Sequence, residues 1–423
     1  MEGIMRKVMV SCLLVLLLSS LSWSTSQPEV KDLRVLGAVD QAVLDYALPA
    51  LAAKGVTAKW LKLDLSDGST MTMDAMVAAG TPPDVYTDYM GRVSKYVTEA
   101  YALDLKPYIK TDDFRPGVLD PLTRNGKLLA LPMPGGAQGM VINLKLLEKI
   151  GEKDFNFDNW KISDFMRMAT KAKAAGVWAT GLFAANQSGD YLWYGWAASF
   201  GAELYKPGDY SKTAMNTPAG LAFFTFLRDM VRDGYAPKEA AVLTDDDYVL
   251  QWASGKILAT AFFPAWVKPY FADVQKQGMG GGDFAYKFVE FPRAPGVTRV
   301  PTAGSYGGIV VAKATKAPKA AALAAETFSD ARAQTLLMRE GSTGRGFPNR
   351  KSVIPVFDDV HWKAIEQIVS ENGLLDLGIS TPKFSEVRSL AIPILQQLYT
   401  NKIEPAAALA AYCAVVDKVL SRP

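Results

Sequence analysis

The stretch LRVLGAVDQAVLDYALPALAAKGVTAKWLKL, residues 33–63, decides the fold class. Its first four residues form an apolar, β-prone run that predicts a strand, and residues 41–54 then predict a helix that ends at Gly55. Residues 57–63 predict the next strand. This order of strand, helix and strand is the beginning of an α/β sheet.

The same alternation continues downstream. Residues 70–79 predict a second helix ending at Gly80, and residues 84–86 predict a third strand after Pro82 and Pro83 stop the helix. Three strands with intervening helices imply parallel pairing. Pro49 inside the first helix is expected to kink or split it.

The middle and the end of the chain are mostly helical. Ser163 is expected to cap a helix to residue 175, and Thr217-Pro218 to begin one that ends at Gly234. Further helices are expected after residue 360. Strand-like runs interrupt the helical part at residues 140–143, 256–263, 286–291 and 307–312. No single linker divides the chain, as expected if two lobes exchange strands.

The amino terminus predicts export. Arg6 and Lys7 precede an apolar run over residues 8–21, which small residues follow, so residues 1–26 read as a signal peptide. The run has 14 residues, whereas a membrane span needs about 20. Lipidation at Cys12 is the less favoured alternative, because most of the apolar run lies beyond it. The mature protein is expected in the periplasm.

Charge and cysteine content narrow the class of protein. Without residues 1–26, 44 Lys and Arg face 42 Asp and Glu, and they are interspersed along the sequence. This pattern disfavours nucleic acid as a partner. Cys413 is then the one remaining cysteine, so an internal disulfide is excluded and a hydrophobic core must hold the protein together. We expect Cys413 to be a small buried hydrophobe.

Five local stretches, in this order, resemble the extracellular solute-binding protein family 1, the maltose-binding-like group. They are AGTPPDVY (79–86), NGKLLALP with VIN (125–132 and 141–143), QWASGKILAT through Ala265-Trp266 (251–266), SYGGIVVA (305–312) and GRGFPNR (344–350). The resemblance implies a two-lobed periplasmic-binding-protein-like fold of type II, in which each lobe is a mixed sheet flanked by helices and the ligand lies between the lobes. It places the first lobe at residues 27–135 plus 288–340 and the second at 136–287 plus 341–423. Crossings between the lobes are expected near residues 132–136, 283–287 and 341–345.

Aromatic residues are the leading candidates for ligand contact, because sugar rings stack their C–H faces on aromatic rings. Residues 191–196 hold four large rings. On a helix Trp193 and Trp196 share a face, so the cluster is expected either to be core or to leave one ring for the ligand. Trp266 matches a position where the family places an aromatic residue facing the ligand. Tyr306 lies among glycines that permit close backbone approach.

Charged candidates are expected at strand ends and crossings. Asp84, Asp88 and Arg345 would supply charge-assisted hydrogen bonds to sugar hydroxyls. The alternative for Arg345 is a salt bridge within the hinge.

Sequence motifs for catalysis or metal binding are weak or absent. The lone histidine, His361, is expected at the surface, and no G-x-S-x-G or Walker motif accompanies it. Residues 245–247 are three aspartates without the spacing of an EF-hand, which favours a solvated turn or a helix start. We expect no metal and no cofactor.

The function expected from these features is that of a monomeric binding protein that closes on a mono- or oligosaccharide and delivers it to the membrane permease of an ABC importer. The alternatives are a secreted carbohydrate-active enzyme, or the same fold binding a glycerol phosphodiester, a polyamine or another small solute.

Overall fold

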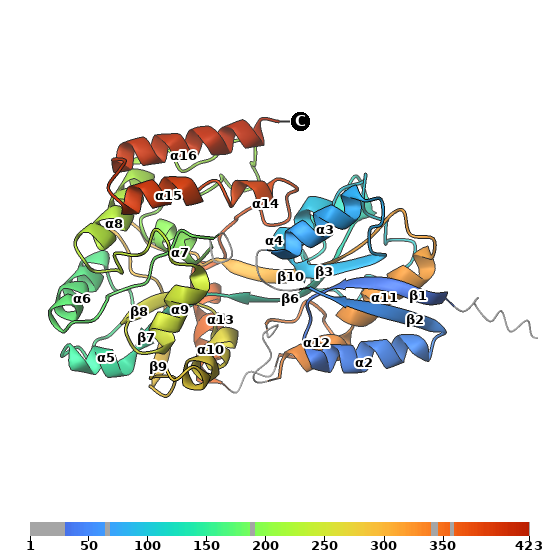
Figure 1. Ribbon diagram of the computed structural model, residues 1–423, viewed down its shortest axis with the longest axis horizontal. Coiled ribbons are helices and arrows are strands. Elements are labelled where there is room, and N and C mark those ends of the chain that lie inside the picture. The colour runs from blue at the N-terminus through green and yellow to red at the C-terminus, as the bar shows by residue number, and fades with distance from the viewer. Residues whose placement is uncertain (1–29, 64–67, 187–190, 340–345, 356–358, 423) are drawn as a thin grey trace, which may run out of the picture.

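A computed structural model describes residues 30–63, 68–186, 191–339, 346–355 and 359–422. Figure 1 shows two lobes, with strands crossing the middle of the molecule. The predicted α/β fold with two lobes is confirmed. Arg345 and the predicted signal peptide lie outside the described residues. Among the residues that are described, no helix is both long enough and apolar enough to span a membrane.

The first lobe is built on a five-stranded sheet of order β2-β1-β3-β10-β6. Strand β1 pairs in parallel with β2 and β3, as the repeated strand–helix order predicts, and β10 is antiparallel to β3 and β6. The strands are β1 (Val30–Gly37), β2 (Val56–Lys62), β3 (Val85–Tyr89), β6 (Leu131–Ala137) and β10 (Gly304–Val311). The helices are α2 (Gln41–Ala52), α3 (Gly68–Ala78), α4 (Met90–Val93), α11 (Pro318–Ser329) and α12 (Ala331–Leu337), and the small strands are β4 (Thr123–Arg124) and β5 (Lys127–Leu128).

The second lobe has an antiparallel sheet of order β8-β7-β9 covered by helices. Its strands are β7 (Gly139–Asn143), β8 (Ala259–Phe262) and β9 (Tyr286–Val289). Its helices are α5 (Leu144–Lys149), α6 (Ile162–Ala174), α7 (Tyr191–Ser199), α8 (Pro218–Arg232), α9 (Asp245–Ala253), α10 (Pro264–Lys276), α13 (Val360–Asn372), α14 (Phe384–Val387), α15 (Ile392–Tyr399) and α16 (Pro405–Leu420).

The sequence predicted most helix ends to within two residues of their positions in the structure. Thr217 caps α8 as expected, since its side chain accepts a hydrogen bond from the Gly220 backbone N–H. Ser163 is not the cap of α6, because the helix begins at Ile162 and Lys161 is the N-cap residue. Helix α2 contains Pro49 without being split, since the helix runs through to Ala52.

Each lobe has its own hydrophobic core. One core gathers buried residues between 33 and 133 and between 309 and 337, and the other gathers residues between 137 and 303 and from 365 onward. The second crossing therefore lies at Ala303-Gly304 and not at residues 283–287. The reason is long-range pairing, since β9 pairs with β7 inside the second lobe. The predicted return of the chain to the first lobe at residue 288 is therefore too early, because buried residues up to Ala303 pack in the core of the second lobe.

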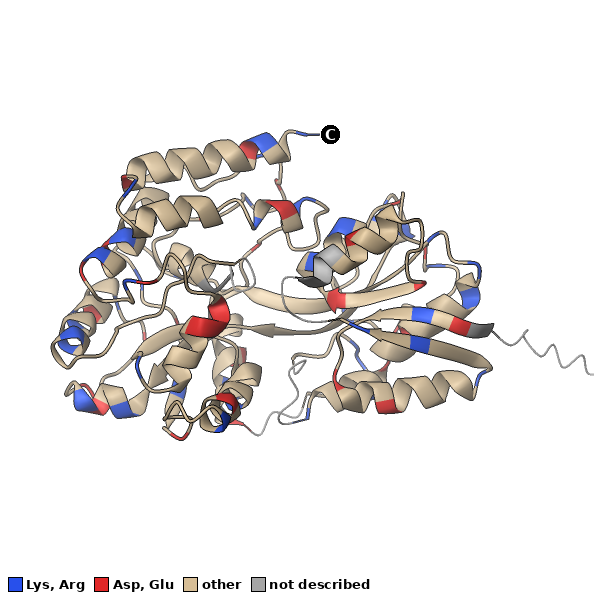
Figure 2. Ribbon diagram, in the orientation of Figure 1, with Lys and Arg blue, Asp and Glu red and all other residues tan. Residues whose placement is uncertain are grey.

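Charged residues of both signs are spread over both lobes (Figure 2). Their distribution gives neither lobe a single sign of charge in this view, which matches the interspersed charges of the sequence. Any recognition of a ligand by charge must therefore depend on individual side chains.

Cys413 lies in α16 and is 6% exposed. Burial raises the pKa of its thiol to about 11. Because the thiolate is the reactive form, we expect a thiol reagent at pH 8 to modify Cys413 about a hundredfold more slowly in the folded protein than in denaturant. Ellman's reagent measures both rates. Equal rates would show that the thiol is accessible and would contradict its place in the core.

Candidate functional site at the lobe boundary

Three chain segments meet where the lobes join. Between β6 and β7, Gln138 donates its backbone N–H to the Ala303 carbonyl at 3.1 Å, and the Thr302 hydroxyl donates to the Gln138 carbonyl at 2.7 Å. The backbone of Phe347 pairs with that of Gly135. A Cβ on the adjacent Gly346 would overlap the Gly135 backbone, so this close approach requires glycine. The crossings thus form one hydrogen-bonded hinge.

The carboxyl end of β3 carries a polar cluster centred on Asp88, which is 4% exposed. Its carboxylate accepts from the Tyr89 backbone N–H at 2.7 Å, from the Tyr86 hydroxyl at 3.1 Å and from Arg92 Nη1 at 3.4 Å. Burial raises the pKa of Tyr86, and the carboxylate raises it further, so the phenol remains a donor. In this arrangement Asp88 orients Tyr89 and Arg92.

Helix α14 of the second lobe faces this cluster. The Phe384 ring meets the Tyr89 ring edge-on, with centroids 6.5 Å apart. The Arg388 guanidinium lies over the Tyr89 ring at 5.4 Å and near the Phe384 ring at 5.7 Å. The Ser385 hydroxyl donates to the Gly91 carbonyl. Ligands of open α/β sheets bind at the carboxyl ends of strands, so this is a place where side chains from both lobes could hold one.

Trp266 lies in α10 at a second contact between the lobes. Its ring packs against Phe263 at 5.4 Å and against Phe262 at 5.9 Å. It also borders a small apolar cluster made by Ala265, Trp362, Met338 and Phe347, in which Met338 follows α12 of the first lobe. Trp266 is half-buried, whereas Trp362 is 2% exposed. In Figure 1 α10 lies below the crossing strands, and α14 with α4 lies above them.

Tyr306, in β10, also takes part in contacts between the lobes. Burial raises the pKa of Tyr306 to about 12, although a side-chain interaction with Ser380 of the second lobe lowers it. Arg124 donates to the Ser380 carbonyl at 3.1 Å. The phenol of Tyr306 is therefore neutral near pH 7.

The structure places the other predicted residues elsewhere. Asp84 lies at the amino end of β3, where its carboxylate accepts from the Arg34 backbone N–H at 2.9 Å and from the Thr315 hydroxyl at 2.6 Å. It joins β1 to the turn after β10, and this geometry offers no support for ligand contact.

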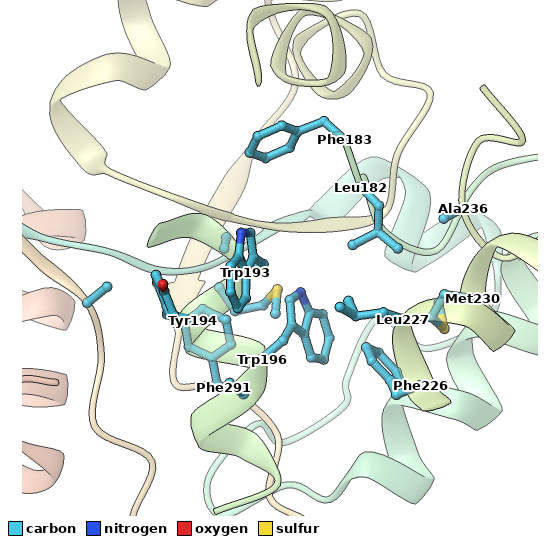
Figure 3. Packing of buried hydrophobic residues seen from close by; sticks show 14 of the residues in the cluster. Leu182, Phe183, Trp193, Tyr194, Trp196, Phe226, Leu227, Met230, Ala236 and Phe291 are labelled. Carbon is cyan, nitrogen blue, oxygen red and sulfur yellow. The ribbon is translucent and has the colours of Figure 1, made fainter. Parts of the chain in front are cut away.

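Trp193 and Trp196 are buried in the second core, at 5% and 2% exposure (Figure 3). They border a small pocket, with room for about one water molecule, that is also lined by Gly181, Leu182, Phe183, Tyr248, Thr260, Ala261 and Tyr399. Both rings are therefore part of the core of the second lobe, and they line one wall of this small pocket.

Weaker sequence signals have structural roles. Asp247 and Thr244 form the capping box of α9, which confirms that residues 245–247 begin a helix. His361, which was expected at the surface, is half-buried: its ring stacks on Tyr286 at 4.1 Å, and burial lowers its pKa. Within the described ranges, no group of three His, Cys, Asp or Glu could hold a metal.

Several residues of the boundary were not predicted: Tyr89, Arg92, Phe384, Ser385 and Arg388. The sequence held one usable signal, since Arg92 follows Asp88 by one helical turn just after a strand. Nothing local distinguishes α14 from the other helices after residue 360.

Comparisons with known proteins agree with this geometry. The family model of bacterial extracellular solute-binding proteins matches residues 39–335. A comparison with curated protein sequences finds no significant match.

Among solved structures, an ABC substrate-binding protein from Listeria monocytogenes in complex with cycloalternan is 16% identical, with a TM-score of 0.75 and coverage of 92% of this chain and 98% of that one. A solute-binding protein from Thermotoga lettingae bound to α-D-tagatose is 17% identical, with a TM-score of 0.75 and coverage of 92% and 100%. A maltose-bound protein from T. maritima is 17% identical, with a TM-score of 0.72 and coverage of 91% and 98%.

Proposed function

This chain belongs to the bacterial extracellular solute-binding protein family, and from that premise we propose that it binds a sugar between its lobes and delivers it to the permease of an ABC importer. The observation that carries the proposal is the lobe boundary, where aromatic and charged side chains from both lobes meet. Sugars need such a mixture, because their C–H faces stack on rings while their hydroxyls need charged or polar partners. The ligands of the three solved structures, cycloalternan, tagatose and maltose, support a sugar as the ligand.

The proposed roles follow from position. Trp266 offers a half-buried ring for stacking. Asp88 positions Tyr89 and Arg92, which would contact the sugar together with Arg388. Trp193 and Trp196 would support the wall of the site from inside the core, and Arg345 would reach the ligand from the third crossing.

We further propose that residues 1–26 are a signal peptide, that the mature chain begins near Gln27 in the periplasm, and that it works as a monomer without catalysing a reaction. Mass analysis of exported material tests the cleavage site. Incubation with oligosaccharides tests for catalysis, since cleavage products would favour a carbohydrate-active enzyme.

A thermal-shift screen tests the ligand class. A ligand that binds only the folded state stabilises it by about 2.7 kcal/mol at a hundred times its dissociation constant, so we expect at least one mono- or oligosaccharide to raise the melting temperature. Glycerol phosphodiesters and polyamines form the comparison arms. A shift confined to those arms would keep the fold and replace the sugar.

A further inference from the structure

The dipeptide Asn-Gly occurs twice in the chain, at residues 125–126 and 372–373. Asparagine is a chemically labile residue, and a following glycine has no side chain to hinder attack on it by the backbone. In a folded protein the attack requires that the glycine N–H be free to react and that the asparagine side chain be able to turn toward it. The two sites differ on both points.

Asn372 is held in an unreactive arrangement. It is 3% exposed, and its side-chain carbonyl accepts from the Val300 backbone N–H at 3.1 Å and from Arg293 Nη2 at 3.4 Å. The Gly373 N–H donates to the Val369 carbonyl at 2.8 Å, at the end of α13. Reaction at Asn372 therefore requires local opening of the second lobe.

Asn125 and Gly126 form the tight turn between β4 and β5. Arg124 pairs with Lys127 across the turn, and the two turn residues have positive φ, 49° and 76°. A turn of two residues with positive φ is of type I′, which Asn-Gly favours. Both residues are exposed, and a Cβ added to Gly126 would meet nothing within 4 Å. Among the described residues, the Gly126 N–H donates to no backbone carbonyl, so the nitrogen is open to reaction.

One contact restrains the Asn125 side chain. Its Nδ2 donates to Glu99 Oε1 at 2.6 Å, and Glu99 forms an ion pair with Lys127. These contacts are exposed to solvent, so water competes for them and they hold the side chain only weakly. Asn125 can thus turn toward the Gly126 nitrogen without any movement of the core.

We propose that Asn125 is a site of spontaneous deamidation in the folded protein. The Gly126 backbone nitrogen forms a bond to the side-chain carbonyl carbon of Asn125, the bond from that carbon to the amide nitrogen breaks, and the backbone proton leaves with the amide group as ammonia. Water then opens the resulting succinimide at either of its carbonyl carbons. The product is aspartate or isoaspartate at position 125.

The modification changes both charge and backbone in the hairpin. It adds a negative charge where Glu99 already carries one, and the two carboxylates then compete for Lys127. Isoaspartate also inserts a methylene group into the backbone, so a turn of two residues no longer keeps Arg124 opposite Lys127. The next residue, Leu128, is 3% exposed in the core of the first lobe. Loss of the pairing is therefore expected to lower the stability of this lobe.

Ageing of the purified protein at mildly alkaline pH tests the proposal, because the reacting nitrogen must lose its proton. Mass spectrometry of peptides cut after glutamate follows the gain of one mass unit at Asn125 and at Asn372, in the folded protein and in guanidinium chloride. In denaturant the two sites should react at similar rates. In the folded protein Asn372 should react at least about tenfold more slowly than Asn125, since it must first be exposed by local opening.

Asn125→Gly is the control, because Gly-Gly also fits a type I′ turn and the reacting side chain is removed. Ageing should leave the mass of its peptide and its melting temperature unchanged, whereas the aged parent protein should melt at a lower temperature as isoaspartate accumulates. A rate at Asn125 in the folded protein as low as that at Asn372 would overturn the proposed site. An aged parent that melts like the fresh protein would overturn the effect on the hairpin.

Discussion

Trp196→Ala should lower the free energy of unfolding by about 3–5 kcal/mol, the cost of truncating a fully buried aromatic side chain. The Trp196 ring packs against Phe165 at 4.8 Å, Phe226 at 4.9 Å and Phe291 at 5.9 Å. These three partners come from separate segments of the second lobe, so no small movement refills the space. Urea unfolding followed by circular dichroism measures the change.

Trp196→Phe is the control, because it keeps a ring in the cavity and should cost clearly less than the alanine variant. A Trp196→Ala protein with unchanged stability and lost ligand binding would show that the ring faces the ligand. That outcome would return Trp196 to the binding residues predicted from the sequence.

The first lobe could be predicted from the sequence because its signals are local. The apolar runs of β1 and β2, the glycines after the helices and the double proline before β3 each act over a few residues. The second crossing could not be predicted in the same way. Residues 286–289 look like any short strand, and only their pairing with β7, more than 140 residues earlier, assigns them to the second lobe.

The candidate binding residues were harder to predict than the fold, because they are brought together by contacts between distant parts of the chain. Asp84 immediately precedes the short strand β3, and Asp88 lies within it near its carboxyl end. The predicted parallel pairing favours Asp88 for ligand contact, but it does not reveal that the Asp84 carboxylate joins Arg34 to Thr315. Tyr89 and Arg388 are about 300 residues apart, and their contact follows from the packing of the lobes.

This packing suggests how the lobe boundary divides its work. The contact between α14 and α4 lies on one side of the crossing strands, and α10, which carries Trp266, lies on the other (Figure 1). A rotation about the crossing strands that brings the lobes together on one side separates them on the other, so the two contacts respond oppositely to it. The effect of truncating Trp266 on affinity therefore shows on which side the ligand is held.

Trp266→Ala should weaken ligand binding by about tenfold to a hundredfold, the loss expected when a large apolar side chain no longer covers the ligand. The ring is half-buried and packs on one side against Phe262 and Phe263, so its removal should cost less stability than that of Trp196. Isothermal titration with the sugar identified by thermal shift measures the affinity, and melting curves without ligand measure the stability.

Trp178→Ala is the matched control for this experiment. Trp178 is also half-buried in the second lobe, but it pairs with Ile257, beyond the end of β8 that lies farthest from the hinge. Its truncation should lower the melting temperature and leave the affinity unchanged.

If both variants lose stability alike and neither loses affinity, Trp266 is a packing residue. Recognition of the sugar must then depend on the residues near the end of β3, which are Asp88, Tyr89, Arg92 and the Arg388 that packs on them. Loss of affinity in Trp266→Ala but not in Trp178→Ala would show that the Trp266 ring contacts the ligand, because truncating a ring that only fills space lowers stability without lowering affinity.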